Sequence, residues 1–241
     1  MKFIKIVTMP SLFLITSAIN TKFGVFKPAV RFSQTLETIS SIRSLMPDAK
    51  IVVLEMCATS LNNEQSQAIK QHVDLLLEFH NDHYVQKIYE AHRWSIVKNL
   101  TEIRCFQLAL TELIKSPIFE NISRVYKISG RYRLNQEFDA KLHSSQKICL
   151  SGKHPSQFPI DLTGVPFTYM SRLWSWPVQQ TSLIEDVYIK GLAYVKQQIG
   201  RGLYCDIEHM LYKYIPENLV EIVAPIGLEG SLGPNGVLVK D

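Results

Sequence analysis

The chain lacks the short motifs that mark several common enzyme classes. No GxGxxG follows its first apolar segment, and neither GxxxxGKS/T nor GxSxG occurs in its 241 residues. These absences argue against a dinucleotide-binding domain, a P-loop nucleotidase and an esterase with a nucleophile elbow. The four cysteines form no CxxC pair, so nothing indicates a zinc ribbon.

Net charge and long apolar runs are also scarce. The net charge is +4, and no run of lysines and arginines resembles the arm of a DNA-binding protein. No segment approaches the ~20 apolar residues of a membrane span. Stable binding to nucleic acid and a membrane span are therefore not expected. The scattered cysteines are expected to be small buried side chains in a reducing compartment, which favours the cytoplasm.

The N-terminal residues 1–18 leave two interpretations open. Lys2 and Lys5 precede an apolar stretch that ends near Ser17-Ala18, as in a weak signal peptide. Pro10 interrupts that stretch, and Leu12–Ser17 has the composition of a buried first strand. We favour the strand, because first strands of α/β domains are often continuous apolar runs.

Apolar periodicity predicts alternating strands and helices in the first half of the chain. The first strand is followed by a helix that begins near Pro28 and ends before Pro47. Further strands are predicted at Ile51–Leu54, Val73–Phe79 and Val125–Ser129, and further helices at Asn62–Gln71 and, as one long element, Tyr84–Ile114.

The second half is less regular. Strands are predicted at Lys147–Leu150, Phe167–Leu173 and Val220–Val223, and a helix at Ser182–Ile199. Ser182 and Glu185 have capping-box spacing at the start of that helix, and Asp206 could cap a further short helix. The glycine-rich tail from Gly227 to Gly236 is expected to be a loop.

This order of elements predicts one α/β domain over 1–241, with a mostly parallel open sheet and helices on both faces. Ligands of such sheets bind beyond the carboxyl ends of the strands. The polar segments that follow the predicted strands are Asn20–Lys22, Glu55, His80–His83 and Gly130–Arg133. We expect these four segments to face one crevice.

Ser129-Gly130-Arg131-Tyr132 is the most informative of these segments. Glycine lets a ligand approach the backbone, arginine offers a planar fork for phosphate oxygens, and tyrosine can stack on a base or a sugar. The alternative is a bulged strand end with a surface arginine. On balance the segment indicates an anion-binding site.

Two further groups of residues are candidates for ligand contact. Lys98 and Glu102 share one face of a predicted helix, where they would either form a surface ion pair or face the crevice. Arg172 and Trp174 lie at the end of a predicted strand, followed by Trp176. The two tryptophan rings would either stack on a ligand or fill the core.

Asp206, Glu208 and His209 lie together at the start of a predicted helix. Acids at this position are favoured by capping and by the helix dipole. A carboxylate held in a crevice is also what a sugar transfer needs as its general base. Base and cap therefore both stay open for the two acids. The three residues are weak candidates for metal ligands, and no stronger metal site is predicted.

Four short segments carry a resemblance to known proteins: Arg31–Leu36, Lys127–Tyr132, Arg172–Ser175 and the tail Glu229–Gly236. They look like segments of glycosyltransferase-like proteins of phages and bacteria, and more distantly of lipopolysaccharide-synthesis proteins of the WavE type. The order of elements resembles the GT-A class of glycosyltransferases, and the similarity covers nearly the whole chain.

The resemblance implies a Rossmann-like nucleotide-binding half over 1–135 and an acceptor half over 136–241. It implies a transferase that moves a sugar from a nucleotide-sugar donor to a hydroxyl of a glycan, a lipopolysaccharide or a modified base. Asp206 and Glu208 would be catalytic. The donor would contact Asn20, Lys22, Glu55, Lys98, Glu102, Ser129, Gly130, Arg131, Tyr132, Arg172 and Trp174.

The chain departs from the GT-A pattern at one position. GT-A enzymes have a DxD motif that holds a divalent metal on the donor diphosphate, and the corresponding segment here, Ser129–Tyr132, has no carboxylate. Arg131, with Arg133 or Arg172, could supply the positive charge instead. A metal-independent transfer is therefore expected. Mn²⁺ or Mg²⁺ would be required if Asp206 and Glu208 served as the acidic pair.

Two other functions are compatible with the same residues. One is a binding module that keeps a glycosyltransferase fold and its ligand but has lost catalysis. The other is a protein associated with single-stranded nucleic acid, with Arg131, Arg172 and the tryptophans on the strand. The low net charge argues against the second.

Overall fold

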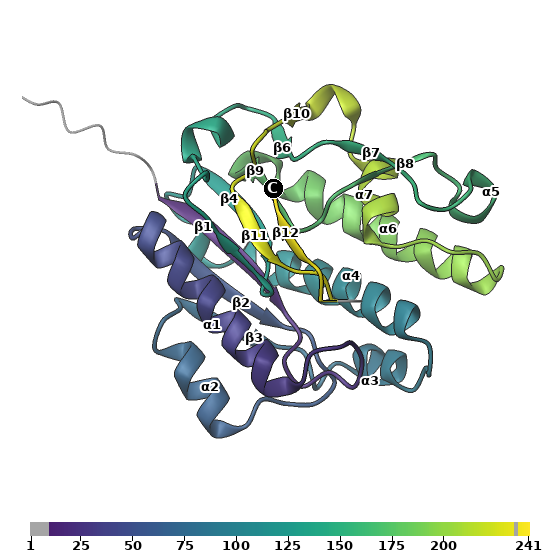
Figure 1. Ribbon diagram of the computed structural model, residues 1–241, viewed down its shortest axis with the longest axis horizontal. Helices are drawn as coiled ribbons and strands as arrows, with labels where there is room; N and C mark the ends of the chain where they lie inside the picture. Colours follow the sequence, from purple (N-terminus) through teal and green to yellow (C-terminus); the bar gives the residue numbers. More distant parts are fainter. Residues whose placement is uncertain (1–9, 234–235) are drawn as a thin grey trace, which may run out of the picture.

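The computed structural model describes residues 10–233 and 236–241. Its centre is a seven-stranded sheet with helices packed on both faces (Figure 1). The strands lie in the order β10-β6-β9-β4-β1-β2-β3. Their bounds are β1 Ser11–Ser17, β2 Lys50–Glu55, β3 Leu75–Glu78, β4 Arg124–Ser129, β6 Ile148–Leu150, β9 Leu173–Pro177 and β10 Val220–Ile222. The predicted α/β class with a mostly parallel sheet is confirmed.

Six of the seven strands of this sheet, β1, β2, β3, β4, β6 and β10, run in the same direction. β1 pairs with β2 on one side and β4 on the other, so that Leu14 lies opposite both Val52 and Lys127. β9 runs antiparallel to β4 and to β6, which makes the sheet mixed. β1 is buried along its whole length. Burial on both faces explains why its sequence is a continuous apolar run rather than an alternating one.

The apolar side chains of the strands divide between two cores. Leu12 and Leu14 point into the larger core, under α4 (Trp94–Leu113), α6 (Thr181–Gly200) and α7 (Ile207–Tyr214). Phe13 and Ile15 point to the opposite face, under α1 (Pro28–Leu45) and α2 (Asn63–Lys70). This alternation is what a pleated strand imposes, and Figure 1 shows the two helical layers on either side of the sheet.

Two predicted elements are each divided in two in the structure. The single helix expected at Tyr84–Ile114 is two helices, α3 (His83–Tyr89) and α4, separated by residues 90–93. The strand expected at Phe167–Leu173 is split between β8 (Phe167–Tyr169) and β9. β8 pairs with β7 (Lys153–Pro155) in a separate two-stranded sheet.

The tail predicted as a loop contains two strands. β11 (Leu228–Ser231) pairs with β12 (Leu238–Lys240) and with β5 (Tyr132–Leu134) in a three-stranded antiparallel sheet. The sequence did not indicate this pairing because glycine is unfavourable within strands. Gly230 lies in β11 with φ 156°.

Helix starts were predicted with mixed success. Asp206 caps α7, as expected. Ser182 and Glu185 form no capping box, because α6 begins one residue earlier and Thr111 Oγ1 donates to Glu185 Oε1 at 2.5 Å. All four cysteines are free and buried, as predicted.

The N-terminal strand is confirmed at Ser11–Ser17, and the stretch before Pro10 lies outside the described residues. Among the helices that the structure describes, none combines the length and apolar character needed to cross a membrane.

Candidate functional site

A pocket lies at the carboxyl ends of β1 and β4. Thr16 and Ser17 reach it from β1, and Ser129 and Gly130 from β4. The chain leaves β1 towards β2 on one side of the sheet, while β4 pairs on the other side. This reversal of strand order opens a crevice where open α/β sheets bind their ligands. We call this cavity the first pocket.

One wall of the first pocket is apolar and the rest is rich in hydroxyl groups. The apolar wall consists of Phe23, Met56, Tyr89, Trp94 and Val97. The hydroxyl groups belong to Thr16, Ser17, Thr21, Thr35, Thr101 and Ser129. A flat ring flanked by hydroxyl groups, such as a nucleoside, has partners of both kinds here.

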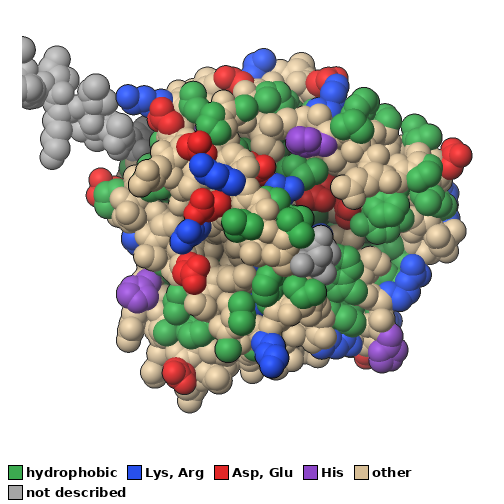
Figure 2. All heavy atoms as spheres, in the orientation of Figure 1, with side chains coloured by type: hydrophobic (Ala, Val, Ile, Leu, Met, Phe, Trp, Pro, Cys, Tyr) green, Lys and Arg blue, Asp and Glu red, His purple; other side chains and the backbone are tan. Residues whose placement is uncertain are grey.

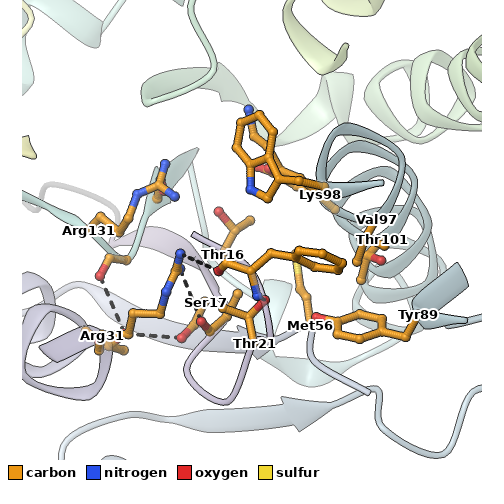
Figure 3. Close-up of a pocket in the computed structure, with 17 residues that line it drawn as sticks. Thr16, Ser17, Thr21, Arg31, Met56, Tyr89, Val97, Lys98, Thr101 and Arg131 are labelled. Atoms are coloured by element: carbon orange, nitrogen blue, oxygen red, sulfur yellow. Dashed lines mark hydrogen bonds between the residues drawn. The ribbon is translucent and has the colours of Figure 1, made fainter. Parts of the chain in front are cut away.

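Three cationic side chains also line the first pocket. Figure 3 shows Arg31 and Arg131 on one side of it, and Lys98 on the other beside Val97 and Thr101 of α4. Arg31 comes from the first turn of α1 and donates to the carbonyl oxygens of Ala18 and Phe23 at 3.2 and 3.4 Å. Burial and the nearby charge of Arg131 lower the pKa of Arg31. An anion placed between the two guanidinium groups would relieve this repulsion.

Arg131 and Arg31 each have a buried Nε without a hydrogen-bond partner among the described residues, and of the two Arg31 alone donates from its Nη atoms to carbonyl oxygens. No carboxylate of residues 10–233 or 236–241 pairs with Arg131. Backbone packs closely over the guanidinium, since a Cβ on Gly233 would lie 2.6 Å from its Nη1. Gly130 is also confined, though less tightly, because a Cβ there would lie 3.2 Å from Thr35 Oγ1. The two glycines therefore allow the crowded approach that places Arg131 at the pocket.

A second pocket adjoins the first. The two share Trp94, Lys98, Glu102, Ser129 and Arg131, so these residues form a common wall. The other side of the second pocket comes from the β7–β8 hairpin, the start of α7 and the C-terminal residues. Two ligands could therefore meet at one wall that carries two cations and a carboxylate.

The carboxylate in the common wall is held by a buried lysine. Lys127 Nζ donates to Glu102 Oε1 at 2.9 Å and to the carbonyl oxygen of Ser171 at 2.6 Å. Burial raises the pKa of Glu102, but the charges of Lys127 and Lys98 lower it by more, so it lies below its ordinary value. Glu102 is therefore an ionised group whose charge is matched within the protein.

Asp206 and Glu208 have different environments. Asp206 Oδ1 accepts the backbone N–H groups of Glu208 and His209, both at 3.1 Å, and lies 2.6 Å from His209 Nδ1. Asp206 Oδ2 accepts from the Tyr204 hydroxyl at 3.0 Å. Glu208 accepts from Ser171 Oγ at 3.1 Å and lines the second pocket. Glu208 is thus the acid of the pair with coordination left for a ligand.

Several predicted donor-binding residues lie outside the first pocket. Asn20 bonds to the Ser60 carbonyl oxygen and to Gln65, and Lys22 donates to the Tyr89 carbonyl oxygen. Glu55 is buried below the pocket, where its Oε1 accepts from the Ile19 N–H at 3.0 Å and burial raises its pKa. These three residues support the loops around the pocket rather than line it.

Arg172 and Tyr132 share one environment, and Trp174 lies in another. Arg172 and Tyr132 line the second pocket, and Arg172 pairs with Asp241 at 2.5 Å. Trp174 and Trp176 are completely buried in the larger core, with ring centroids 4.6 Å apart. Both tryptophan rings are therefore inaccessible for stacking on a ligand, and the single-strand interpretation had relied on them.

Sequence reasoning missed three residues of this region. Lys127 lies in a predicted strand and in a segment of the resemblance, but its burial points to a further role, because a lysine in a buried strand needs a charged partner. Arg31 was quoted only for its resemblance. Ser156, whose Oγ lies 2.9 Å from His209 Nε2, follows a strand that was not predicted.

The weak metal candidates do not assemble into a site. Within the described part of the chain, no group of three or more His, Cys, Asp or Glu side chains is placed to hold a metal ion. Asp206 directs its oxygens at N–H and O–H donors, which is the arrangement of a helix cap. The donor set of Asp206, Glu208 and His209 therefore does not fit a divalent metal.

Comparison with known proteins adds no relative: no family model and no curated protein matches this chain.

Proposed function

We propose that this protein is a glycosyltransferase that moves a sugar from a nucleotide-sugar donor to a hydroxyl acceptor. One observation carries the proposal: Arg131, with a buried Nε that has no partner among the described residues, lies in the wall common to two adjoining pockets. A transferase needs two ligand sites that meet where the leaving group develops negative charge. The sequence resemblance to GT-A enzymes supports the same function.

The donor would occupy the first pocket. Its base and ribose would lie against the apolar wall and the hydroxyl groups, and its diphosphate between Arg31, Lys98 and Arg131. An arginine guanidinium can donate two hydrogen bonds to the oxygens of one phosphate. A single ion pair does not make such a two-point contact. The charge of Arg131 lowers the pKa of Arg31, so a diphosphate between the two guanidinium groups would interact favourably with both.

The acceptor would occupy the second pocket, with its hydroxyl near Glu208. The hydroxyl oxygen attacks the anomeric carbon of the sugar while Glu208 takes the hydroxyl proton. The bond between the anomeric carbon and the diphosphate oxygen breaks, and its electron pair stays on the diphosphate. Arg31, Lys98 and Arg131 stabilise that charge, as preorganised cations do in water-poor sites.

In this proposal the cations take the place of the metal that GT-A enzymes hold at a DxD motif. The segment Ser129–Tyr132 offers Arg131 where that motif would offer carboxylates. The wall also carries Lys98, whose Nζ lies 5.6 Å from the Trp94 ring centroid. Donor binding is therefore expected without a divalent cation.

The test is thermal unfolding with uridine, guanosine, adenosine and cytidine diphosphates and their sugar conjugates, each with manganese and with EDTA. A ligand at 100 times its Kd stabilises the folded state by about 2.7 kcal/mol, which raises the midpoint. We expect one nucleoside family to raise it in EDTA. A rise only with manganese would overturn the metal-independent mechanism, and no rise with any nucleotide would overturn the function.

Arg131→Met and Arg133→Met form a matched pair for this test. Arg133 lies two residues further on, pairs with Glu229 and lines neither of the two pockets. We expect Arg131→Met to weaken nucleotide binding 10- to 100-fold, as loss of a charge-assisted contact does, and Arg133→Met to leave it unchanged. Equal effects of the two substitutions would show that Arg131 does not contact the donor.

A further inference from the structure

A crevice with both aliphatic and polar side chains in its lining lies next to the second pocket. It is lined by Ile96 of α4, Leu162 of α5 (Ile160–Thr163), Ile199 of α6 and Leu203. Tyr204 lines both this crevice and the second pocket, so one aromatic ring borders the two cavities. The backbone here is already satisfied, since the Tyr204 N–H donates to the Leu162 carbonyl oxygen at 3.1 Å.

Exposed apolar side chains continue from the second pocket towards this crevice. Phe158, Ile160 and Leu162 lie within five residues of one another, and their exposed fractions are 41%, 54% and 40%. Figure 2 shows hydrophobic side chains gathered at the end of the molecule where α5 lies in Figure 1. Phe158 packs on Tyr204 with ring centroids 4.4 Å apart. Clustered exposed apolar side chains are a feature of ligand-binding grooves and of interaction surfaces.

We propose that the acceptor carries a hydrocarbon chain, which crosses the Phe158–Tyr204 ring pair and lies in the crevice. The proposal rests on the proposed function, because it takes the second pocket as the acceptor site. With the hydroxyl at Glu208, a chain leaving the second pocket meets Tyr204 first and aliphatic side chains beyond it. Apolar surface on both partners is removed from water together.

The polar groups of the crevice do not oppose a chain. Asn99 Oδ1 is the one polar atom there that is both shielded from solvent and without a hydrogen bond among the described residues. Because it is already shielded, covering it with methylene groups removes no hydration. Arg93 is exposed at the crevice and can keep its charge in water. A chain would pack against Ile96, Leu162, Ile199 and Leu203, while the polar side chains Arg93, Ser95 and Asn99 line the same crevice.

The experiment measures binding of methyl, hexyl and octyl glucosides and maltosides by calorimetry, below their micelle concentrations, with the full chain. A fully buried methylene tightens binding about fourfold, so octyl, with two more methylenes, should bind about 15-fold more tightly than hexyl with either headgroup. Leu162→Gln should remove most of this dependence on chain length. Leu142→Gln is the matched control, because Leu142 is 43% exposed on a separate 3-10 helix, Ala140–His143.

Three results would overturn the proposal: affinity independent of chain length, equal losses in Leu162→Gln and Leu142→Gln, or binding to phospholipid vesicles without binding to monomeric alkyl glycosides. The last would identify α5 as a membrane-docking surface. Failure here leaves the nucleotide-dependent rise in unfolding midpoint intact. Failure of the proposed function removes that rise and leaves any alkyl-chain binding measurable, so the two are distinguishable.

Discussion

His209 Nδ1 lies 2.6 Å from Asp206 Oδ1, and the same carboxylate oxygen caps α7, the helix that carries His209. On its other side, His209 Nε2 lies 2.9 Å from Ser156 Oγ, so the ring links α7 to the turn after β7. This arrangement fixes the start of α7 and thereby the position of Glu208. Asp206 therefore stabilises the start of α7, whereas Glu208, two residues further on, faces the second pocket.

This difference predicts opposite effects for the two acids. Asp206→Ala should lower the free energy of unfolding by about 1–2 kcal/mol, because it removes a helix cap. Glu208→Gln should change stability by less than about 0.5 kcal/mol, as expected for a half-buried residue outside such a network. It should lower the rate of sugar transfer by about 10²- to 10⁴-fold, as loss of a general base does. Urea unfolding and a transfer assay check both, and a fully active Glu208→Gln would contradict the assignment.

The same pair predicts how stability responds to acid. Burial raises the pKa of Asp206, but the hydrogen bonds and charge of His209 lower it by more, so its pKa lies below the ordinary value. A carboxyl with a lowered folded-state pKa stabilises the protein above its unfolded pKa of about 3.9, and this stabilisation is lost as the pH falls through the folded value. Asp206→Asn should therefore flatten the loss of stability between about pH 5 and pH 2. The measurement is the unfolding midpoint against pH, with Glu208→Gln as the control that should keep the wild-type slope.

Much of the fold could be predicted because it depends on local patterns. The apolar run at Leu12–Ser17 and the cap at Asp206 each determine an element within a few residues, and both are confirmed. The edge of the sheet that carries the pocket follows from strand order alone. The strands of the tail depend on a distant partner, β5, so periodicity did not reveal them.

The candidate site was predictable only in part, for a related reason. Arg131 follows a strand end directly, so the topology places it at the crevice. Trp174 has the same sequence signal, but β9 is an interior strand, and both of its tryptophan rings pack under α4 and α6. Ser156 and His209 are 53 residues apart, and only the folded chain brings them together. Side-chain direction and long-range pairing are tertiary properties that composition does not carry.

The Lys127–Glu102 pair predicts a strong thermodynamic coupling. Lys127→Met should lower the free energy of unfolding by about 3 kcal/mol, because it leaves Glu102 without its buried partner. Adding Glu102→Gln should recover part of this loss, with a coupling of at least about 1 kcal/mol in a double-mutant cycle. Lys190 and Asp186 form an exposed pair on α6, and the same cycle there should give less than about 0.5 kcal/mol. Equal couplings for the two pairs would show that burial does not strengthen the first.

Substituting alanine at Gly227 and at Gly202 distinguishes the cost of backbone strain from the cost of steric overlap. Both residues are in the left-handed region, with φ 78° and 75°. A Cβ on Gly227 would lie 2.2 Å from Phe138 Cα, whereas a Cβ on Gly202 would meet nothing within 4 Å. Gly202→Ala should lower the free energy of unfolding by about 1 kcal/mol, the cost of a left-handed alanine. Gly227→Ala should cost a further ~1–3 kcal/mol, because backbone atoms must move apart, as in other overpacked sites. Urea unfolding of the two variants checks this difference, and equal losses would mean that the loop before β11 yields without cost.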